Sequence, residues 1–345
     1  MADYRIALVP GDGVGPEVIS SARQVLEAVA VRTGIEFAFA SFLAGKAAYD
    51  ETGNSLPDAT LDGIRNADAA LMGAMSTGLV PPPSPMGVLR RALDLYADVR
   101  PIQSYPGVWC LRDNLDLYVV RENTEGFLAD RNLYKGSGEF MPDPDTVLSL
   151  RVITRKNSRR IARFCFELAR NLRRKKITVA HKANVLRLGC GFFLEIVREA
   201  GKEYPEITLE DTYVDSVAND LVRHPERFDV ILTTNLFGDI LSDEAAALVS
   251  SLVPTANFGA DCALFRPIHE ALLPQPGKNV ANPLPTILCG QMMLDWLGET
   301  EAAWVLQEAV RRFLADGKDF PADLGGSGTT TEVTVAVCRK VKEIE

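Results

Sequence analysis

Short runs of apolar and β-branched residues alternate along the chain with stretches whose apolar residues recur every three or four positions. The short runs predict strands at 4–9, 35–42, 67–73, 115–122, 175–182, 207–215 and 228–235. The periodic stretches predict helices at 17–31, 158–174, 237–252, 286–297 and 301–315, with Ser158 as the expected N-cap of the second helix. Strands that alternate with helices in this way are typical of an α/β protein.

Two segments interrupt the alternation. The first is PPPSP (81–85), and the second is the Gly-, Pro- and Asp-rich stretch 126–146, which precedes the strand-like run 147–155. A long hairpin or arm fits the second segment better than a core element does. With 345 residues, the chain exceeds the usual size of a single core, so one large domain or two modest domains are expected.

Charge and composition exclude several classes of function. A net charge of -9 disfavours binding to nucleic acid or to an anionic membrane surface. We find no apolar run of about 18 residues and no secretory signal pattern at the start, so we expect a cytoplasmic protein. The six cysteines lie far apart without zinc-site spacing, which favours free thiols.

A glycine-rich turn, PGDGVGPE (10–17), follows the first strand and opens the first helix, where backbone N–H groups can face a phosphate or ribose. It is not a dinucleotide fingerprint, because Pro16 stands where the third glycine of G-x-G-x-x-G would fall. Glycine also serves tight structural turns. Both readings of Gly11, Gly13 and Gly15 therefore stay open on the residues alone.

Carboxylates gather in LFGDILSDEAA (236–246), where Asp239 and Asp243 are four residues apart and so share one face of a predicted helix. Hard carboxylate oxygens suit Mg²⁺ or Mn²⁺. The alternative is a helix-start aspartate beside a solvated one. Asp215, at the end of another predicted strand, could supply a third carboxylate.

Basic residues fall at the ends of predicted elements, where α/β folds build their sites. Arg90, Arg100 and Arg121 could together bind carboxylates, although each alone is more often a surface residue. Lys182 ends the apolar strand ITVAHK. Partial burial could lower its pKa enough for general-base catalysis, whereas a surface lysine is the alternative.

Taken in order, the motifs resemble those of the β-decarboxylating dehydrogenases, the isocitrate/isopropylmalate dehydrogenase family, over nearly the whole chain. The motifs are LVPGDGVGPEV (8–18), LRRALDLYADVRP (89–101), VVRENTEG (119–126), VAHKANVL (179–186), TTNLFGDILSDEAA (233–246), GKNVANP (277–283) and DLGGSGTTTE (323–332). This resemblance implies a mixed sheet flanked by helices rather than a Rossmann domain. It also implies a discontinuous cofactor-side domain, 1–97 plus 251–345, and a domain for substrate, metal and dimerisation, 98–250, with an arm near 126–155.

By position, the resemblance also implies roles for individual residues. Arg90, Arg100 and Arg121 match the arginines that bind substrate carboxylates, and Lys182 matches the catalytic lysine, aided by Asp215. Asp215, Asp239 and Asp243 match the metal-linked aspartates. The loop with Gly11, Gly13 and Gly15 lines the cofactor cleft, as do His269 and Asn282. A homodimer is implied in which Lys182 and Asp215 complete the site of the neighbouring subunit.

The implied reaction is the oxidation of a malate-type 2-hydroxy acid with hydride transfer to NAD(P), followed by loss of CO₂, with Mg²⁺ or Mn²⁺ bound. One departure concerns protonation of the resulting enol. Leu128 stands where the family has a tyrosine that donates this proton, and leucine cannot donate one. Tyr134 or a metal-bound water are the alternative donors, and slow or altered protonation is expected.

A second departure lies in the cofactor loop, where the family's HGSAPD-type run becomes HEALLP (269–274). Pro274, followed by Gln275, stands where an NAD-selecting aspartate or an NADP-selecting lysine is found. NAD is the expected cofactor, without excluding NADP. The alternative function is that of a paralogue with weakened cofactor binding, acting as a non-oxidative decarboxylase or a regulatory subunit.

Substrate choice in the family is set on the helix that carries Arg90, which begins SPMGVLRR (84–91). Ser84 matches a position that hydrogen-bonds the distal carboxylate in isocitrate-type members. Ser84 followed by Pro85 is also a favourable N-cap and N1 pair, and we favour this capping role.

Overall fold

The structure is a computed structural model that describes residues 3–76, 78–127, 133, 136, 138–268 and 276–344. The chain forms two compact units. Unit 1 comprises Met1–Leu93, Ser104–Asp113 and Val249–Glu345, and unit 2 comprises Asp94–Gln103 and Asn114–Leu248. Ser104–Asp113 belongs to unit 1, whereas the sequence-based division assigned it to 98–250. The division into a cofactor side and a substrate side stays a prediction.

Unit 1 contains five strands in the order β2-β1-β3-β12-β11. They are β1 (Asp3–Val9), β2 (Glu36–Ser41), β3 (Ala69–Met72), β11 (Pro254–Phe258) and β12 (Ala263–Pro267). β11 and β12 are antiparallel and the other pairs are parallel. β3 is a continuous apolar run and every residue in it is buried, as expected for a strand between two neighbours.

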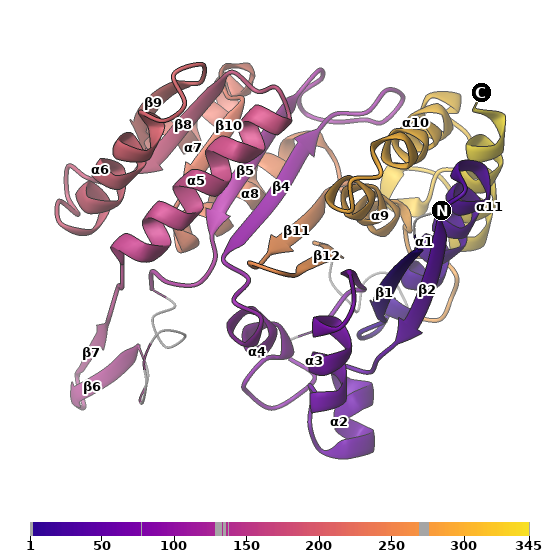
Figure 1. The fold of residues 1–345 in the computed structure, drawn as a ribbon, viewed down its shortest axis with the longest axis horizontal. Helices are drawn as coiled ribbons and strands as arrows, with labels where there is room; N and C mark the ends of the chain where they lie inside the picture. Colours follow the sequence, from indigo (N-terminus) through magenta and orange to yellow (C-terminus); the bar gives the residue numbers. More distant parts are fainter. Residues whose placement is uncertain are drawn as a thin grey trace. The chain divides into compact units, whose positions relative to one another are not determined.

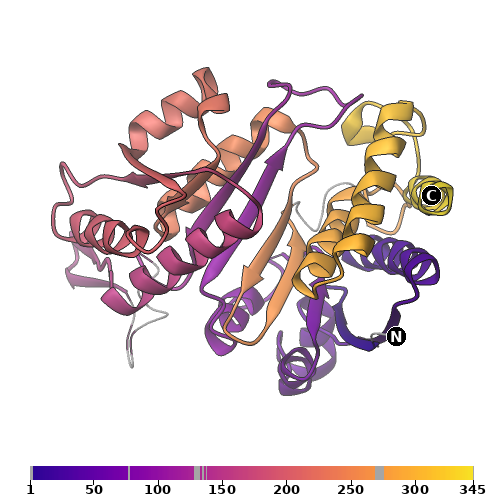
Figure 2. The same cartoon turned by 45° about the horizontal axis from the view of Figure 1, so that its top comes forward.

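The helices of unit 1 are α1 (Gly15–Thr33), α2 (Lys46–Thr52), α3 (Asp58–Arg65), α4 (Pro85–Ala92), α9 (Leu284–Trp296), α10 (Thr300–Asp316) and α11 (Thr330–Glu343). α1 packs against α9, α10 and α11, so the two ends of the chain meet in this unit (Figure 2). The buried face of α1, with Val18, Val25 and Leu26, provides the apolar side that this packing requires.

Unit 2 contains strands in the order β4-β5-β10-β8-β9. They are β4 (Ala97–Gln103), β5 (Asp116–Glu122), β8 (Lys176–His181), β9 (Thr208–Tyr213) and β10 (Val230–Thr233). β4 and β5 are antiparallel and the remaining pairs are parallel. Mixed sheets with flanking helices confirm the predicted fold class.

The helices of unit 2 are α5 (Arg155–Asn171), α6 (Gly189–Gly201), α7 (Val214–Arg223) and α8 (Asn235–Val249). α5 packs on α6, and both contact the strands of this unit (Figure 1). The predicted N-cap of α5 was wrong. Thr154, not Ser158, caps this helix, because its backbone is extended and its hydroxyl accepts a hydrogen bond from Asn157 N.

A two-stranded hairpin, β6 (Glu139–Asp143) with β7 (Thr146–Ser149), occupies part of the segment in which we expected an arm. Figure 1 shows it extending away from the strands of unit 2, and all of its residues are exposed. At its base, Gly126 and Val152 form an isolated antiparallel bridge. Within the described ranges, no helix combines the length and the apolarity needed to cross a membrane.

Candidate functional site

Two predicted substrate-binding arginines lie side by side in unit 2. Arg100 is on β4 and Arg121 is on β5, and Asp98 stands opposite Arg121 in the strand register. Asp98 is 3.5 Å from Arg100 Nε and 3.9 Å from Arg121 Nη1, and all three residues are buried. Sequence reasoning missed Asp98, although its position two residues before Arg100 on one strand places both on the same face.

Helix α8 adds the two predicted metal-linked aspartates to this cluster. Asp239 lies 3.3 Å from Arg100 Nη2 and also pairs with Arg121, while Asp243 pairs with Arg100. The spacing of four residues therefore places both carboxylates on one face, as the sequence predicted. Burial opposes the charge of Arg100, but Asp98, Asp243 and Asp239 outweigh it and raise its pKa. The guanidinium stays charged.

Arg121 is held in place by Asn235 and Gly238, at the start of α8. Asn235 is fully buried, and its side-chain oxygen accepts hydrogen bonds from Arg121 Nε at 3.0 Å and Nη2 at 2.7 Å. A Cβ at Gly238 would lie 2.7 Å from both Cβ and Cγ of Arg121. Glycine at this position therefore lets the helix approach the arginine, and Asn235, one turn before Asp239, fixes its orientation.

The loop after β5 connects this cluster to α5. Asn235 Nδ2 donates to the Glu125 carbonyl, and the Glu125 carboxylate accepts hydrogen bonds from Thr154 N and Oγ1. The buried Glu122 carboxylate accepts bonds from Thr124 N and from Glu125 N, both at 2.9 Å. Burial raises the pKa of Glu122 to about 7, because the low dielectric disfavours the ionised form.

Lys182 and Asp215 form a second pair in unit 2. Lys182 follows β8 directly, and its Nζ lies 2.5 Å from Asp215 Oδ1. The position predicted for Asp215, the end of a strand, was wrong, because it lies in the first turn of α7. The hydrogen bond from Lys182 lowers the pKa of Asp215. Both side chains remain partly exposed, which leaves them accessible to a ligand.

Two carboxylates of this cluster could contribute to a site for a divalent cation. Asp239 and Asp243 offer hard carboxylate oxygens on one helix face, and their side chains are 47% and 69% exposed. Over the described part of this single chain, no three His, Cys, Asp or Glu side chains gather into a metal site. Asp239 and Asp243 thus suit Mg²⁺ or Mn²⁺ as part of a larger set of ligands.

In unit 1, the glycine-rich turn has clear structural reasons for its glycines. Gly11 and Gly13 have φ of +76° and +57°, where a side chain is strained. A Cβ at Gly15 would lie 2.0 Å from the Pro10 carbonyl oxygen. The buried Asp12 carboxylate accepts hydrogen bonds from Lys46 N at 2.6 Å and Ser76 N at 3.1 Å. Tight packing therefore accounts for the turn, and its role toward a cofactor stays a prediction.

The remaining predicted residues of unit 1 have defined surroundings. Asn282 is buried and donates to Asp323 at 3.0 Å, while its oxygen accepts from Leu284 N. Ser84 caps α4 by accepting a hydrogen bond from Gly87 N at 3.1 Å, with Pro85 at the first helical position. Arg90 is in the last turn of α4 and is half-buried.

Several predictions concern positions outside the described residues. These positions are His269, Leu128, Tyr134, Pro274 and Gln275. The enol donor and the residues that select the nicotinamide cofactor therefore stay predictions.

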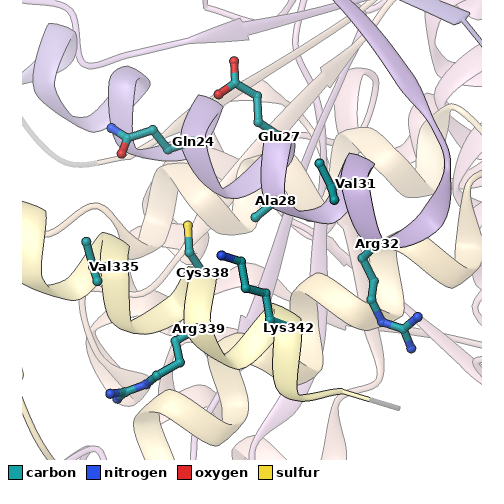
Figure 3. Close-up of a pocket in the computed structure, with 9 residues that line it drawn as sticks. All are labelled: Gln24, Glu27, Ala28, Val31, Arg32, Val335, Cys338, Arg339 and Lys342. Carbon is teal, nitrogen blue, oxygen red and sulfur yellow. The ribbon is translucent and has the colours of Figure 1, made fainter.

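A hollow of about 960 Å³ lies between α1 and α11 and contains none of the predicted site residues. Figure 3 shows Cys338 and Lys342 extending from α11 toward α1. Its charged side chains include Glu27, which pairs with Arg23, and Arg339, which lies 3.8 Å from Glu343. Neighbouring side chains thus balance the charges of Glu27 and Arg339, and we assign this hollow no ligand.

The chain is similar to known proteins over nearly its whole length. The sequence profile described as isocitrate/isopropylmalate dehydrogenase matches residues 5–337. The 3-isopropylmalate/3-methylmalate dehydrogenase of Methanocaldococcus jannaschii is 42% identical over 99% of both chains. The isocitrate/homoisocitrate dehydrogenase of Thermus thermophilus is 43% identical, also over 99% of both chains.

A solved structure has a similar fold. The crystal structure of isocitrate dehydrogenase from Methylococcus capsulatus superposes with a TM-score of 0.89 at 41% sequence identity. The superposition covers 98% of this chain and 99% of the other.

Proposed function

Because the chain belongs to the isocitrate/isopropylmalate dehydrogenase family, as its motifs predicted, we propose that it oxidises and decarboxylates a malate-type 2-hydroxy acid, with hydride transfer to NAD or NADP. Its named relatives are 3-isopropylmalate, homoisocitrate and isocitrate dehydrogenases. All of these are dehydrogenases of 2-hydroxy acids that carry further carboxylates.

The observation that supports the proposal most directly is the cluster of Arg100 and Arg121 with Asp239 and Asp243. Buried guanidinium groups bind carboxylates strongly, in part because they stay charged. Arg100 and Arg121 bind the carboxylates of the substrate, and Arg90 contributes a further contact. Asp243 pairs with Arg100 and Asp239 pairs with Arg121, so a substrate carboxylate would compete with these aspartates for the guanidinium groups.

Asp239 and Asp243, together with Asp215 from the neighbouring subunit, would hold Mg²⁺ or Mn²⁺. Such a cation would supply positive charge that favours loss of the hydroxyl proton and stabilises the enolate formed on decarboxylation. Lys182 and Asp215 of one chain would act together in the neighbouring subunit's site, where Lys182 accepts the hydroxyl proton and Asp215 orients its amine through their hydrogen bond. The glycine loop 11–15, His269 and Asn282 contact the cofactor.

A shared active site requires a dimer, and two exposed apolar surfaces support one. Leu236 and Ile240 on α8 are 40% and 58% exposed. The hairpin β6–β7 exposes Phe140, Met141 and Val147, and an isolated two-stranded hairpin is only marginally stable in water. A second copy of the chain would cover both surfaces. We place this homodimer in the cytoplasm.

Substrate class and cofactor can be tested in one assay. The purified chain is offered malate, 3-methylmalate, 3-isopropylmalate, isocitrate and homoisocitrate with Mn²⁺ and either NAD or NADP, and reduced nicotinamide is followed by absorbance. Turnover of one 2-hydroxy acid that stops with EDTA supports the proposal. In a parallel sample that contains a β-keto acid instead, CO₂ release by a chain that oxidises none of these hydroxy acids would identify a non-oxidative decarboxylase.

A further inference from the structure

Arg151 lies between the hairpin and α5, and its guanidinium is fixed on several sides. Its Nη2 donates to Thr234 Oγ1 at 3.2 Å, and its Nη1 donates to Cys190 Sγ at 3.5 Å. Its Cζ lies 5.8 Å and 5.5 Å from the ring centres of Phe127 and Phe237. These contacts orient a half-buried cation, but none of them carries a negative charge.

Four arginines of α5, by contrast, have carboxylate partners. Arg155 and Arg159 pair with Glu199, Arg160 pairs with Asp94, and Arg163 pairs with Glu203. Among the described side chains, no carboxylate lies within 4 Å of Arg151 or of Arg187. The half-buried guanidinium of Arg151 and the exposed guanidinium of Arg187 are therefore both available to pair with an anion.

Arg151 and Arg187 line one hollow of about 660 Å³, entirely within unit 2. Ile153, Leu188 and Phe192 provide its apolar lining, and Glu195 is its acidic residue. The two guanidinium groups outnumber this single carboxylate, so the hollow is positively charged overall. Its volume lies within the range of small-molecule sites.

The first residue of α6, Gly189, leaves room for the Arg151 guanidinium. A Cβ at Gly189 would lie 2.8 Å from Arg151 Nη1, so a side chain there would displace the guanidinium. No side chain caps the helix at Leu188, and the first-turn N–H groups favour nearby negative charge. The absence of a side chain at Gly189 thus allows the arginine to lie against the start of the helix.

We propose that this hollow binds a small organic anion, whose carboxylate or phosphate pairs with Arg151 and Arg187 and whose apolar part contacts Ile153, Leu188 and Phe192. The site is separate from the cluster of Arg100 and Arg121. Thr234 connects the two, because it contacts Arg151 and precedes Asn235, which holds Arg121.

The test uses 4-fluorobenzoate, which combines a carboxylate with an apolar ring, and follows its ¹⁹F signal as the full-length protein is titrated. Saturable binding is expected. Arg151→Met should weaken it about 10-fold or more, because a charge-assisted hydrogen bond is lost. Arg187→Gln removes an exposed guanidinium without disturbing the core, so it tests the site even if Arg151→Met fails to fold. It should weaken binding about 3-fold.

Arg159→Gln is the matched control, because it removes an arginine of α5 that pairs with Glu199 outside the hollow. Its binding should equal that of the unchanged chain. If inorganic phosphate displaces 4-fluorobenzoate, the site accepts a phosphate-bearing ligand. If 4-fluorobenzoate stays bound in the presence of phosphate, the site prefers a carboxylate. The proposal is overturned if binding is not saturable, or if Arg121→Met abolishes binding while Arg151→Met and Arg187→Gln leave it unchanged. None of these measurements requires turnover, so they are independent of the proposed function.

Discussion

The Asn235 side-chain oxygen accepts two hydrogen bonds from Arg121, one from Nε and one from Nη2. This arrangement fixes the plane of the guanidinium and leaves Nη1 for Asp239. Asn235→Ala should raise KM for the 2-hydroxy acid about 10-fold with a smaller change in kcat, because the charged arginine loses its acceptor. Steady-state kinetics at saturating Mn²⁺ and cofactor measure both constants.

Asn157→Ala is the control for this prediction. Asn157 also donates to Glu125, at 3.0 Å, but it does not contact Arg121. If both variants raise KM equally, the effect comes from loosening of the loop 122–125, and Asn235 has no specific role in positioning Arg121.

Lys182 is predicted to accept the substrate proton. Lys182→Met should lower kcat by a factor of about 10² to 10⁴, the usual contribution of a general base, while substrate binding measured by calorimetry persists. Lys176→Met is the control, because Lys176 is on the preceding strand and pairs with Glu210 at 3.3 Å. A fall in kcat of less than tenfold for Lys182→Met would assign the proton transfer to another group.

The features that follow from local periodicity could be predicted from the sequence. The spacing of Asp239 and Asp243 predicts a shared helix face, and both aspartates do contact Arg100. The partners that come from distant segments could not be predicted. Asp98 approaches Arg121 through antiparallel pairing of β4 and β5, which depends on register rather than on local pattern. The contacts of Arg151 could not be predicted either, because its partners Cys190 and Thr234 lie 39 and 83 residues away in the sequence.

Element boundaries were harder to predict than element types. Ser158 and Thr154 are both favourable N-caps, and the hydrogen bonds that Thr154 N and Oγ1 donate to Glu125 favour the earlier start of α5. Asp215 was placed at the end of a strand because ITLEDTYVD is continuous in pattern, yet α7 begins at Val214. Tertiary contacts therefore decide the start of α5.

The capping role of Ser84 can be separated from a role in substrate binding. Ser84→Ala removes the acceptor for Gly87 N and should lower the free energy of unfolding by about 1 kcal/mol in urea denaturation. Ser84→Asn retains a favourable cap and should preserve stability. If Ser84→Asn is stable but raises KM more than tenfold, Ser84 contacts the substrate in addition to capping α4.

The buried Glu122 carboxyl should make stability depend on pH. Its pKa is raised from 4.5 to about 7, mainly by burial, and the hydrogen bonds from Thr124 and Glu125 offset this only in part. The folded chain therefore binds the proton more tightly than the unfolded chain. The resulting stabilisation is complete below pH 4.5 and is lost as the pH rises through 7.

The free energy of unfolding should therefore fall between pH 5 and pH 8, with a contribution from Glu122 of roughly 3 kcal/mol. Glu122→Gln should remove this contribution, although its amide nitrogen cannot accept the hydrogen bond from Glu125 N and stability at pH 5 should decrease. Urea denaturation at both pH values measures the difference, and Glu301→Gln, at an exposed position of α10, is the control. Asp295, whose pKa is raised to about 6, also makes the free energy of unfolding fall as the pH rises. The contribution of Glu122 is therefore the difference in this fall between the unchanged chain and Glu122→Gln. An equal fall in both chains would mean that Glu122 is ionised in the folded state throughout this range.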